Sequence, residues 1–326
     1  MIYILSIIDE FDNDSNDKGV PVMSGEHKNT IQKPTTTKTT RKKGLSQKQA
    51  DILIAIVAMT WGSSYLMMKI GLTGIPPFSI IALRFCIAFL VVALIFLPKM
   101  KLMNLRTLGY GSILGLFLFG VFAFLVPGMK FTTASNAGFL IGIVSVFVPV
   151  VHSLLKRKLP SKRTSLGVFL ALLGICLLTF FSTLTINLGD VLCILGAFCY
   201  TIQIILMDYF TQKVDSFLLG IWQLGFTGLY GVIFTFLFET PALPGSSAQW
   251  GAILGLAIVC SAFGFIIQPV AQRYTSPEHT SMLFALEPVF SMIFAYIFLH
   301  EKLSLHGTIG AALIMIGVLT AATSKE

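Results

Sequence analysis

Two charged residues lie well inside long apolar runs of the 326-residue sequence, away from the ends of the runs, where a charge costs about 2.5–3.5 kcal/mol if the run enters a bilayer. Glu287 lies eight residues into the run 279–299, and Arg84 lies six residues into the run 78–97. A carboxylate there could bind a cationic group or a coupling proton, or could bond backbone groups that Pro288 leaves free. Arg84 could hold a carboxylate through two hydrogen bonds, or could snorkel outward or pair internally.

Aromatic and neutral polar side chains also fall inside the apolar runs. Trp61 and Tyr200 lie near the middle of two runs, whereas aromatic residues that anchor a protein in a bilayer lie at its interfaces. Their position favours the wall of a cavity. Polar residues in the same and neighbouring runs could line that cavity, or could hydrogen-bond one helix to another. These polar candidates are Ser64, Asn136, Gln203, Gln223 and Gln268.

The composition excludes several classes of protein. The chain is 55% hydrophobic and 12% charged, and its mean hydropathy is +0.83, whereas soluble domains are about a quarter charged. This excludes a disordered chain and an ordinary water-soluble enzyme. Five cysteines without metal-ligand spacing predict buried thiols rather than a disulfide scaffold or a metal site. The net charge of +8 lies in short loops, so it does not predict a nucleic-acid partner.

We predict an all-α integral membrane protein with ten transmembrane helices. Apolar runs of about 20 residues are long enough to cross a bilayer as helices. The runs are continuous, whereas the strands of a membrane barrel alternate in hydrophobicity. Proline and polar residues separate the predicted spans, which are 52–71, 78–97, 108–127, 132–154, 164–182, 190–209, 216–238, 250–271, 279–299 and 304–322.

Lysine and arginine predict how these spans are oriented. They are concentrated in the N-terminal tail and in every second connection, while the opposite connections contain only Lys130 and Lys302. Since positive loops stay in the cytoplasm, we expect both termini to be cytoplasmic and the number of spans to be even. We therefore expect a multi-pass protein of the plasma membrane, with the lipid bilayer as its partner.

The first 48 residues differ from the rest. The Thr/Lys-rich stretch 33–43 cannot bury enough apolar surface to fold, so we predict that residues 1–48 form a disordered cytoplasmic tail. The apolar residues 1–8 are too few for a span and lack the basic lead of a secretory signal. Met23 is a second candidate for the start of translation.

The two halves of the sequence resemble each other at a nearly constant offset. At an offset of 139 the segment Asp51–Ile70 aligns with Asp190–Tyr209, and the offset becomes 140 and then 143 further along. Apolar sequence can match itself by chance, but four blocks in the same order favour a true repeat. The aligned residues include Trp61 with Tyr200, Ser64 with Gln203, Arg84 with Gln223, and Gly167 and Gly174 with Gly310 and Gly317.

This alignment predicts two repeats, at residues 49–184 and 185–326, each with five helices. An odd number of spans makes the second copy enter the membrane from the opposite side. We therefore expect inverted repeats, an architecture that gives a membrane protein two interchangeable states around a site at the midplane.

Several motifs resemble those of the drug/metabolite transporter superfamily, in particular its EamA-type members. They are WGSSY at 61–65, TTASNAGFL at 132–140, SPEHTSMLFALEP at 276–288 and GAALIMIGV at 310–318. The resemblance covers about residues 50–323. It implies ten spans in two repeats, movement of small metabolites such as amino acids, often as export, and no soluble cofactor. The first motif adds Tyr65 to the candidate substrate-binding residues.

We expect a secondary transporter with alternating access around a central cavity for a small polar or amphipathic molecule, which includes drugs as candidate substrates. No phosphate-binding loop is present, so proton coupling through Glu287 and facilitated diffusion both stay open. The alternative is a channel or a sensor, although we find neither rings of charge nor a soluble output domain. An intramembrane enzyme would need motifs that the spans lack, so we expect no catalytic residues and no cofactor. The sequence does not indicate an oligomeric state.

Overall fold

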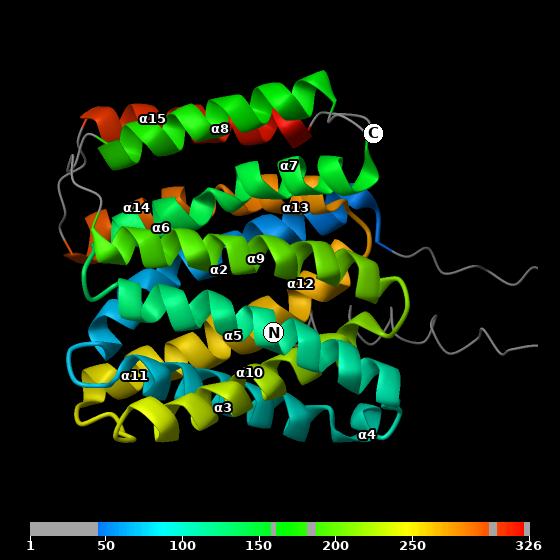
Figure 1. The fold of residues 1–326 in the computed structure, drawn as a ribbon, viewed down its shortest axis with the longest axis vertical. Coiled ribbons are helices and arrows are strands. Elements are labelled where there is room, and N and C mark those ends of the chain that lie inside the picture. The colour runs from blue at the N-terminus through cyan, green and yellow to red at the C-terminus, as the bar shows by residue number, and fades with distance from the viewer. Residues whose placement is uncertain (1–44, 158–160, 181–186, 300–304, 323–326) are drawn as a thin grey trace, which may run out of the picture. The chain divides into compact units, whose positions relative to one another are not determined.

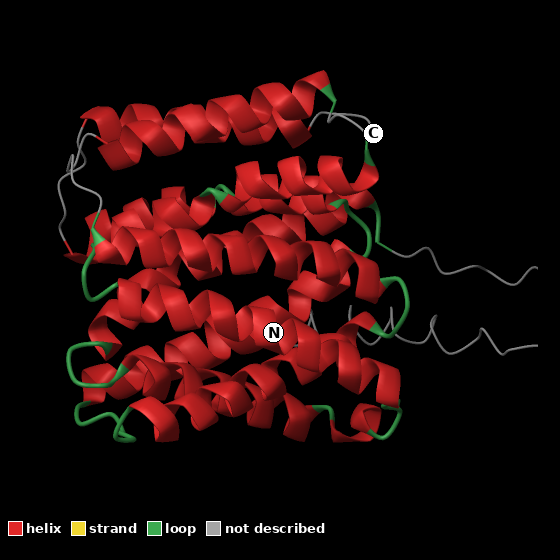
Figure 2. Ribbon diagram, viewed as in Figure 1, coloured by secondary structure: helices red, strands yellow, loops and turns green. Residues whose placement is uncertain are grey.

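The computed structural model describes residues 45–157, 161–180, 187–299 and 305–322 (Figure 1). The chain divides into two compact units, Met1–Ser46 and Gln47–Glu326, and the described helices belong to the second. Within these ranges every regular element is a helix (Figure 2). Residues 1–44 of the predicted disordered tail lie outside the described residues.

The helices follow the apolar runs of the sequence. Before residue 184 they are α2 (Gln47–Gly71), α3 (Pro77–Ile95), α4 (Leu97–Met100), α5 (Leu105–Gly128), α6 (Ala134–Gly142), α7 (Val144–Lys156) and α8 (Lys162–Phe180). After it they are α9 (Leu188–Thr211), α10 (Ser216–Phe238), α11 (Ser247–Gly255), the π-helix η1 (Leu256–Phe263), α12 (Gly264–Gln272), α13 (Pro277–Phe284), α14 (Glu287–Leu299) and α15 (Leu305–Ala322).

Eight helical segments in the described ranges are long and apolar enough to cross a membrane, when α6–α7, α11–α12 and α13–α14 are each taken as one segment. A shorter apolar stretch, Thr308–Thr320, lies in α15. The expected spans 164–182 and 304–322 correspond to α8 and α15, which are not among the eight.

Polar residues between the apolar runs cap the helices. The Asn104 side chain accepts a hydrogen bond from the Thr107 backbone N–H at 2.7 Å at the start of α5. Asn187 and Asp190 form a reciprocal capping box at the start of α9. Such caps satisfy backbone donors that a helix start would otherwise leave unpaired, so the sequence fixes where these spans begin.

Two of the expected continuous spans are each broken into two helices, at corresponding positions. The fourth span breaks between α6 and α7, and the ninth between α13 and α14. In the first break the Ile143 N–H bonds to Leu140 O at 3.3 Å, and in the second the Leu286 N–H bonds to Leu283 O at 3.1 Å. These residues correspond at the offset of 143. The two segments therefore share the same local fold.

The cap before each broken span also corresponds. The Thr133 side chain accepts a bond from the Asn136 N–H, and the Ser276 side chain accepts one from the His279 N–H. Pro288 contributes to the second break because it has no N–H for an intrahelical bond.

The π-helix η1 lies where the repeat offset changes. The offset is 140 at Gly115 and Gly255, before η1, and 143 at Lys130 and Arg273, after it. A π-helix forms bonds between residues i and i+5, so it takes up more residues per turn than an α-helix. The α5 segment, which is the counterpart in the first half, is one continuous helix. The segment Ser247–Gln272 has 26 residues, against 24 in α5, so most of the change in offset is absorbed within the helix.

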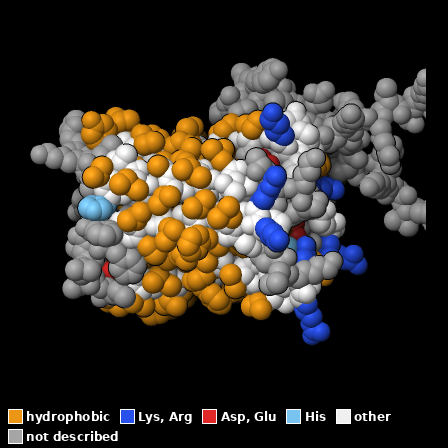
Figure 3. All heavy atoms as spheres, turned by 90° about the horizontal axis from the view of Figure 1, so that it is seen from above, with side chains coloured by type: hydrophobic (Ala, Val, Ile, Leu, Met, Phe, Trp, Pro, Cys, Tyr) orange, Lys and Arg blue, Asp and Glu red, His pale blue; other side chains and the backbone are white. Residues whose placement is uncertain are grey.

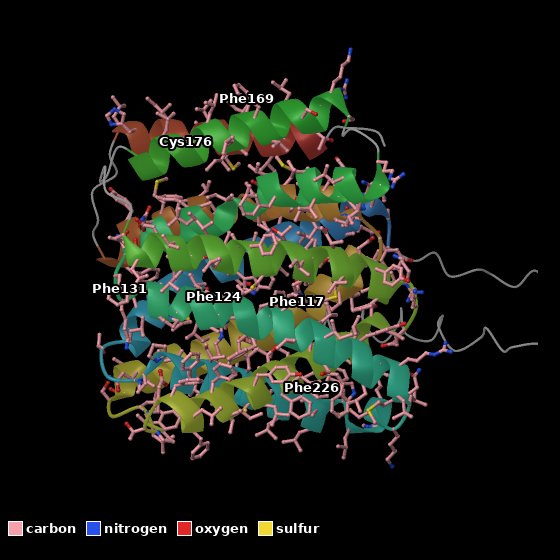
Figure 4. All side chains as sticks on the ribbon, viewed as in Figure 1. Phe117, Phe124, Phe131, Phe169, Cys176 and Phe226 are labelled. Carbon is pink, nitrogen blue, oxygen red and sulfur yellow. The ribbon has the colours of Figure 1, made fainter. Side chains whose placement is uncertain are left out.

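The most extensive contacts between helices join the two halves of the chain, for example those of α3 with α10, α5 with α9, and α8 with α15. The pair α8–α15 lies at one edge of the helix array (Figure 1). Phe169 of α8 is 55% exposed on this pair (Figure 4).

Glycines allow α8 and α15 to approach closely. A Cβ atom added to Gly174 would lie 2.6 Å from Gly310 O, and one added to Gly317 would lie 2.7 Å from Gly167 O. The same four glycines align between the halves of the sequence. Close backbone approach through small residues is a common way for helices to pack within a membrane.

Hydrophobic side chains form a broad band over the face that Figure 3 shows, and lysine and arginine side chains gather at one end of it. Many of the exposed side chains are large and apolar, for example Leu94 at 71% and Phe236 at 72% exposure. Monomeric soluble proteins rarely expose apolar patches of this kind, so this band fits contact with lipid.

The glycine contact predicts the effect of a Gly174→Ala substitution. The added methyl group meets backbone atoms of α15, and overpacking of this kind costs about 1–3 kcal/mol of unfolding free energy. A lower midpoint of thermal unfolding in detergent is expected. Gly251→Ala is the control, because a Cβ atom there meets nothing within 4 Å, so its midpoint should be unchanged or higher. Equal midpoints for the two variants would contradict this packing.

Candidate functional site

A small buried cavity lies where α2, α3, α5, α6, α9, α12 and α14 meet. Its volume of about 20 Å³ is enough for roughly one water molecule. Six of the ten candidate residues border it, and the rest of its lining is apolar. The lining residues are Trp61, Ser64, Tyr65, Arg84, Leu118, Val121, Phe122, Leu125, Ile141, Tyr200, Phe265 and Glu287.

Glu287 is the first residue of α14, directly after the break in the ninth span. It is 6% exposed, and its Oε1 atom accepts a hydrogen bond from the Tyr65 hydroxyl at 2.8 Å. The start of a helix carries a partial positive charge, which stabilises a carboxylate. The broken helix and Tyr65 together hold this side chain at the cavity.

Arg84 is fully buried and points inward rather than snorkelling to the surface. Its Nε atom donates to the Ser261 hydroxyl at 2.9 Å, and its Nη1 atom lies 3.6 Å from the Met68 sulfur. The guanidinium carbon lies 4.4 Å from the centre of the Phe122 ring and 4.8 Å from that of Phe85. The Nη2 atom is buried and has no hydrogen-bond partner.

Arg84 and Glu287 border the same cavity without forming an ion pair with each other, and no other carboxylate of the described residues pairs with Arg84. Buried charges are normally paired, because removal from water without compensation is costly. The site therefore presents one positive and one negative group, and the positive group still has a donor to offer.

Trp61 is at the centre of the aromatic wall. Its ring centre lies 4.6 Å from that of Phe265, 5.0 Å from that of Phe284 and 6.1 Å from that of Tyr200. Its indole N–H donates to Cys260 O at 2.8 Å.

The acceptor of this last bond belongs to the π-helix. At the end of that helix the Gly264 N–H bonds to Ser261 O rather than to Cys260 O, which would be its partner in an α-helix. The same helix carries the Ser261 hydroxyl that binds Arg84. A π-helix inside a span often marks a functional site, and here it positions two cavity residues.

Three glutamines that were expected in the cavity wall are bonded to one another instead. Gln268 Nε2 donates to Gln203 Oε1 at 3.3 Å, and Gln203 Nε2 donates to Gln223 Oε1 at 3.2 Å. Gln223 Nε2 in turn donates to Phe265 O at 3.0 Å. All three glutamines are fully buried. We call Gln203, Gln223 and Gln268 the glutamine ladder.

Asn136 also lies apart from the cavity lining. Its amide donates to Asp190 Oδ1 at 2.7 Å and to the Thr132 hydroxyl at 2.8 Å. It thus joins the start of α6 to the capping box of α9. The alternative reading of its polar side chain, hydrogen bonding between helices, describes this geometry.

Polar contacts at the opposite ends of the spans also join the two halves. His152 of α7 is 6% exposed and pairs with Glu278 of α13. Asp51 of α2 accepts a bond from the Thr275 hydroxyl at 2.8 Å and lies 3.7 Å from the His279 ring.

Sequence reasoning missed the aromatic cavity residues Phe122 and Phe265, and it missed Ser261, which binds the cavity residue Arg84 without bordering the cavity itself. The repeat contains a signal for two of them, because Phe122 and Phe265 correspond at the offset of 143. Ser261 had no such signal, since its position depends on the π-helix.

Both halves of the chain match the same known family. The model of the EamA-like transporter family matches residues 48–180 and again residues 187–323. The chain belongs to the EamA-like transporter family. It is a multi-pass membrane protein, and the family assigns it a role in membrane transport.

Relatives of this EamA-family protein have the same general name. Two proteins of Archaeoglobus fulgidus, each named an uncharacterized transporter, are 28% and 31% identical over 85% and 84% of this chain and 86% and 98% of their own. The uncharacterized transporter YoaV of Bacillus subtilis is 24% identical over 82% of this chain and 95% of its own. A solved crystal structure shares the fold, with a TM-score of 0.70 and 19% identity over 85% of this chain and 98% of its own.

The contact between Arg84 and Ser261 predicts that Ser261→Ala destabilises this EamA-family protein. The substitution leaves a buried guanidinium with one bond fewer, and a bond to a charged group is worth about 1.5–3 kcal/mol. We expect a lower midpoint of thermal unfolding in detergent. Ser281→Ala is the matched control, since Ser281 is also fully buried but bonds only to Glu278 O of its own helix. A loss that is no larger than in the control would contradict the role of Ser261.

Proposed function

We propose that this protein is a secondary transporter for amino acids with apolar or aromatic side chains, working by alternating access in the plasma membrane. The observation that carries the proposal is the pair of opposite, mutually unpaired charges, Arg84 and Glu287, in one apolar cavity. A zwitterion neutralises both charges at once, whereas a simple cation or anion leaves one of them uncompensated.

The groups of such a substrate match the groups of the site. The substrate carboxylate would accept from the free Nη2 donor of Arg84, and its ammonium group would donate to Glu287. The apolar side chain would pack against Trp61, Phe122 and Phe265. Tyr65, Ser64 and Tyr200 border the same space and can add hydrogen bonds.

The size of the cavity supports a conformational change during transport. About 20 Å³ holds no amino acid, so the site must widen to bind one. We propose ten spans in two inverted repeats, residues 49–184 and 185–326, with α8 and α15 as the fifth span of each. The corresponding caps and helix breaks of α6–α7 and α13–α14 support this arrangement.

The distribution of charge supports cytoplasmic termini. Lysine and arginine side chains gather at one end of the face that Figure 3 shows. In the chain, Lys156 and Arg157 lie at the end of α7, and Lys213 follows α9. The pairs of His152 with Glu278 and of Asp51 with Thr275 would then close the cytoplasmic side. Thr132 and Asn136 would close the outer side by binding Asp190. Export is the proposed direction, and the proposal includes neither an enzymatic activity nor a cofactor.

Flux in proteoliposomes tests the function. Vesicles that contain the purified protein should release preloaded, radiolabelled phenylalanine or leucine faster than vesicles without protein. A pH gradient across the membrane then distinguishes proton coupling from facilitated diffusion. No flux of any apolar or aromatic amino acid, in either direction and with or without the gradient, would overturn the proposal.

The two charges predict the effects of single substitutions on this flux. Glu287→Gln removes the negative charge with little change of shape, and we expect roughly tenfold slower flux because one charged hydrogen bond to the ammonium group is lost. Arg84→Gln should have an effect of similar size. Glu239→Gln is the matched control, because Glu239 only accepts bonds from Phe78 and Ser79 at the start of α3. Unchanged flux in Glu287→Gln, with or without a pH gradient, would exclude a role for this carboxylate.

A further inference from the structure

The glutamine ladder corresponds to one side of the cavity through the repeat. At the offset of 139, Gln203 corresponds to Ser64 and Gln223 corresponds to Arg84. At the offset of 143, which holds after the π-helix, Gln268 corresponds to Leu125. In the structure the three first-half residues border the cavity and their three counterparts do not.

Two aromatic cavity residues of the first half differ from these three, because their counterparts in the second half also border the cavity. Trp61 and its counterpart Tyr200 both border the cavity, and so do Phe122 and its counterpart Phe265. The cavity is therefore symmetric in these two aromatic pairs and asymmetric in the three residues that correspond to the ladder. Inverted repeats reach their second state by exchanging conformations, so the asymmetric residues should exchange their roles.

The ladder lies next to the cavity on α9 and α12, the helices that carry Gln203 and Gln268. Gln203 follows the cavity residue Tyr200 by three positions in α9, and Gln268 follows the cavity residue Phe265 by three positions in α12. Residues three apart in a helix lie on the same face, one turn along. Both helices end at the same side of the molecule, because α9 is followed by Gln212 and Lys213, α12 is followed by Arg273, and Gln212 Nε2 donates to Arg273 O at 3.0 Å. The ladder thus lies between the cavity and the proposed cytoplasmic side.

One atom of the ladder lacks a partner. Gln268 is fully buried, its amide nitrogen donates to Gln203, and its Oε1 atom accepts no hydrogen bond. Buried polar atoms are nearly always bonded, so an unbonded acceptor next to a cavity indicates a ligand or water that binds in another state.

We propose that the glutamine ladder is a second binding station, which takes the polar end of the substrate when the cavity opens toward the cytoplasm. This inference rests on the proposed function and extends it to the second state. The amide groups can donate to a carboxylate and accept from an ammonium group, as Arg84 and Glu287 do in the first state. Because the amides are neutral, this station holds a charged substrate more weakly than Arg84 does.

Cysteine accessibility tests the second station. In a variant without the five native cysteines, Gln203→Cys and Gln268→Cys should react with a charged, membrane-impermeant methanethiosulfonate in inside-out vesicles. We expect them to react at least about tenfold more slowly in right-side-out vesicles, because only the cytoplasmic opening exposes them. Leu125→Cys, the counterpart of Gln268, should show the reverse preference. Leu219→Cys, in a buried cluster of α10, should react from neither side.

The outcomes separate this inference from the proposed function. If phenylalanine flux persists and Leu125→Cys reacts from outside, but both glutamine positions stay unreactive from the cytoplasmic side, the ladder is purely structural. Reaction of the glutamine positions from the outer side would overturn the inference in the same way. If the unsubstituted protein carries no amino-acid flux, the proposed function is overturned instead.

A second variant keeps the test decisive if the cysteine variants fold poorly. Gln268→Leu fills the space without the amide, and we expect flux to fall about fivefold. The midpoint of thermal unfolding should fall only slightly, because the removal of an unbonded buried acceptor offsets part of the hydrogen bond that Gln203 Oε1 loses. Flux equal to that of the unsubstituted protein would contradict a binding role for the ladder.

Discussion

Two opposite charges share one apolar cavity without touching each other, and most of the structure around the cavity serves to hold them there. Arg84 is compensated by the Ser261 hydroxyl, a methionine sulfur and two aromatic ring faces. Glu287 is compensated by Tyr65 and by the start of α14. The partners of Arg84 do not fully replace water, because its Nη2 atom has no hydrogen-bond partner. A substrate that carries both charges would complete the compensation.

The two irregular helices of the second half create this arrangement. The break between α13 and α14 places Glu287 at a helix start, and the π-helix presents Ser261 and Cys260 O to the first half. The first half has a similar break, but Val144 is the counterpart of Glu287, so only one half supplies the carboxylate. The repeat therefore provides the framework, and local departures from it provide the chemistry.

The lengths of the apolar runs, and the proline and polar residues between them, were sufficient to predict most of the helices. The repeat predicted that Trp61 and Tyr200 border one cavity, and both do. Arg84 and Glu287 could be selected because charges are costly in lipid. The glutamines and Asn136 could not be assigned, since a polar side chain in a span fits a cavity and a helix contact equally well. The π-helix left only a drift of three residues in the repeat offset, and this drift has no structural meaning until the helices are seen.

Ligand stabilisation tests the central claim, that the cavity needs both charges of a zwitterion. The midpoint of thermal unfolding of the purified protein is measured with phenylalanine, with phenethylamine, which lacks the carboxylate, and with phenylpropionate, which lacks the ammonium group. A ligand at a hundred times its dissociation constant adds about 2.7 kcal/mol to the unfolding free energy, so binding raises the midpoint. Of the three ligands, we expect only phenylalanine to raise the midpoint of thermal unfolding clearly. Equal stabilisation by either single-charge analogue would contradict the account.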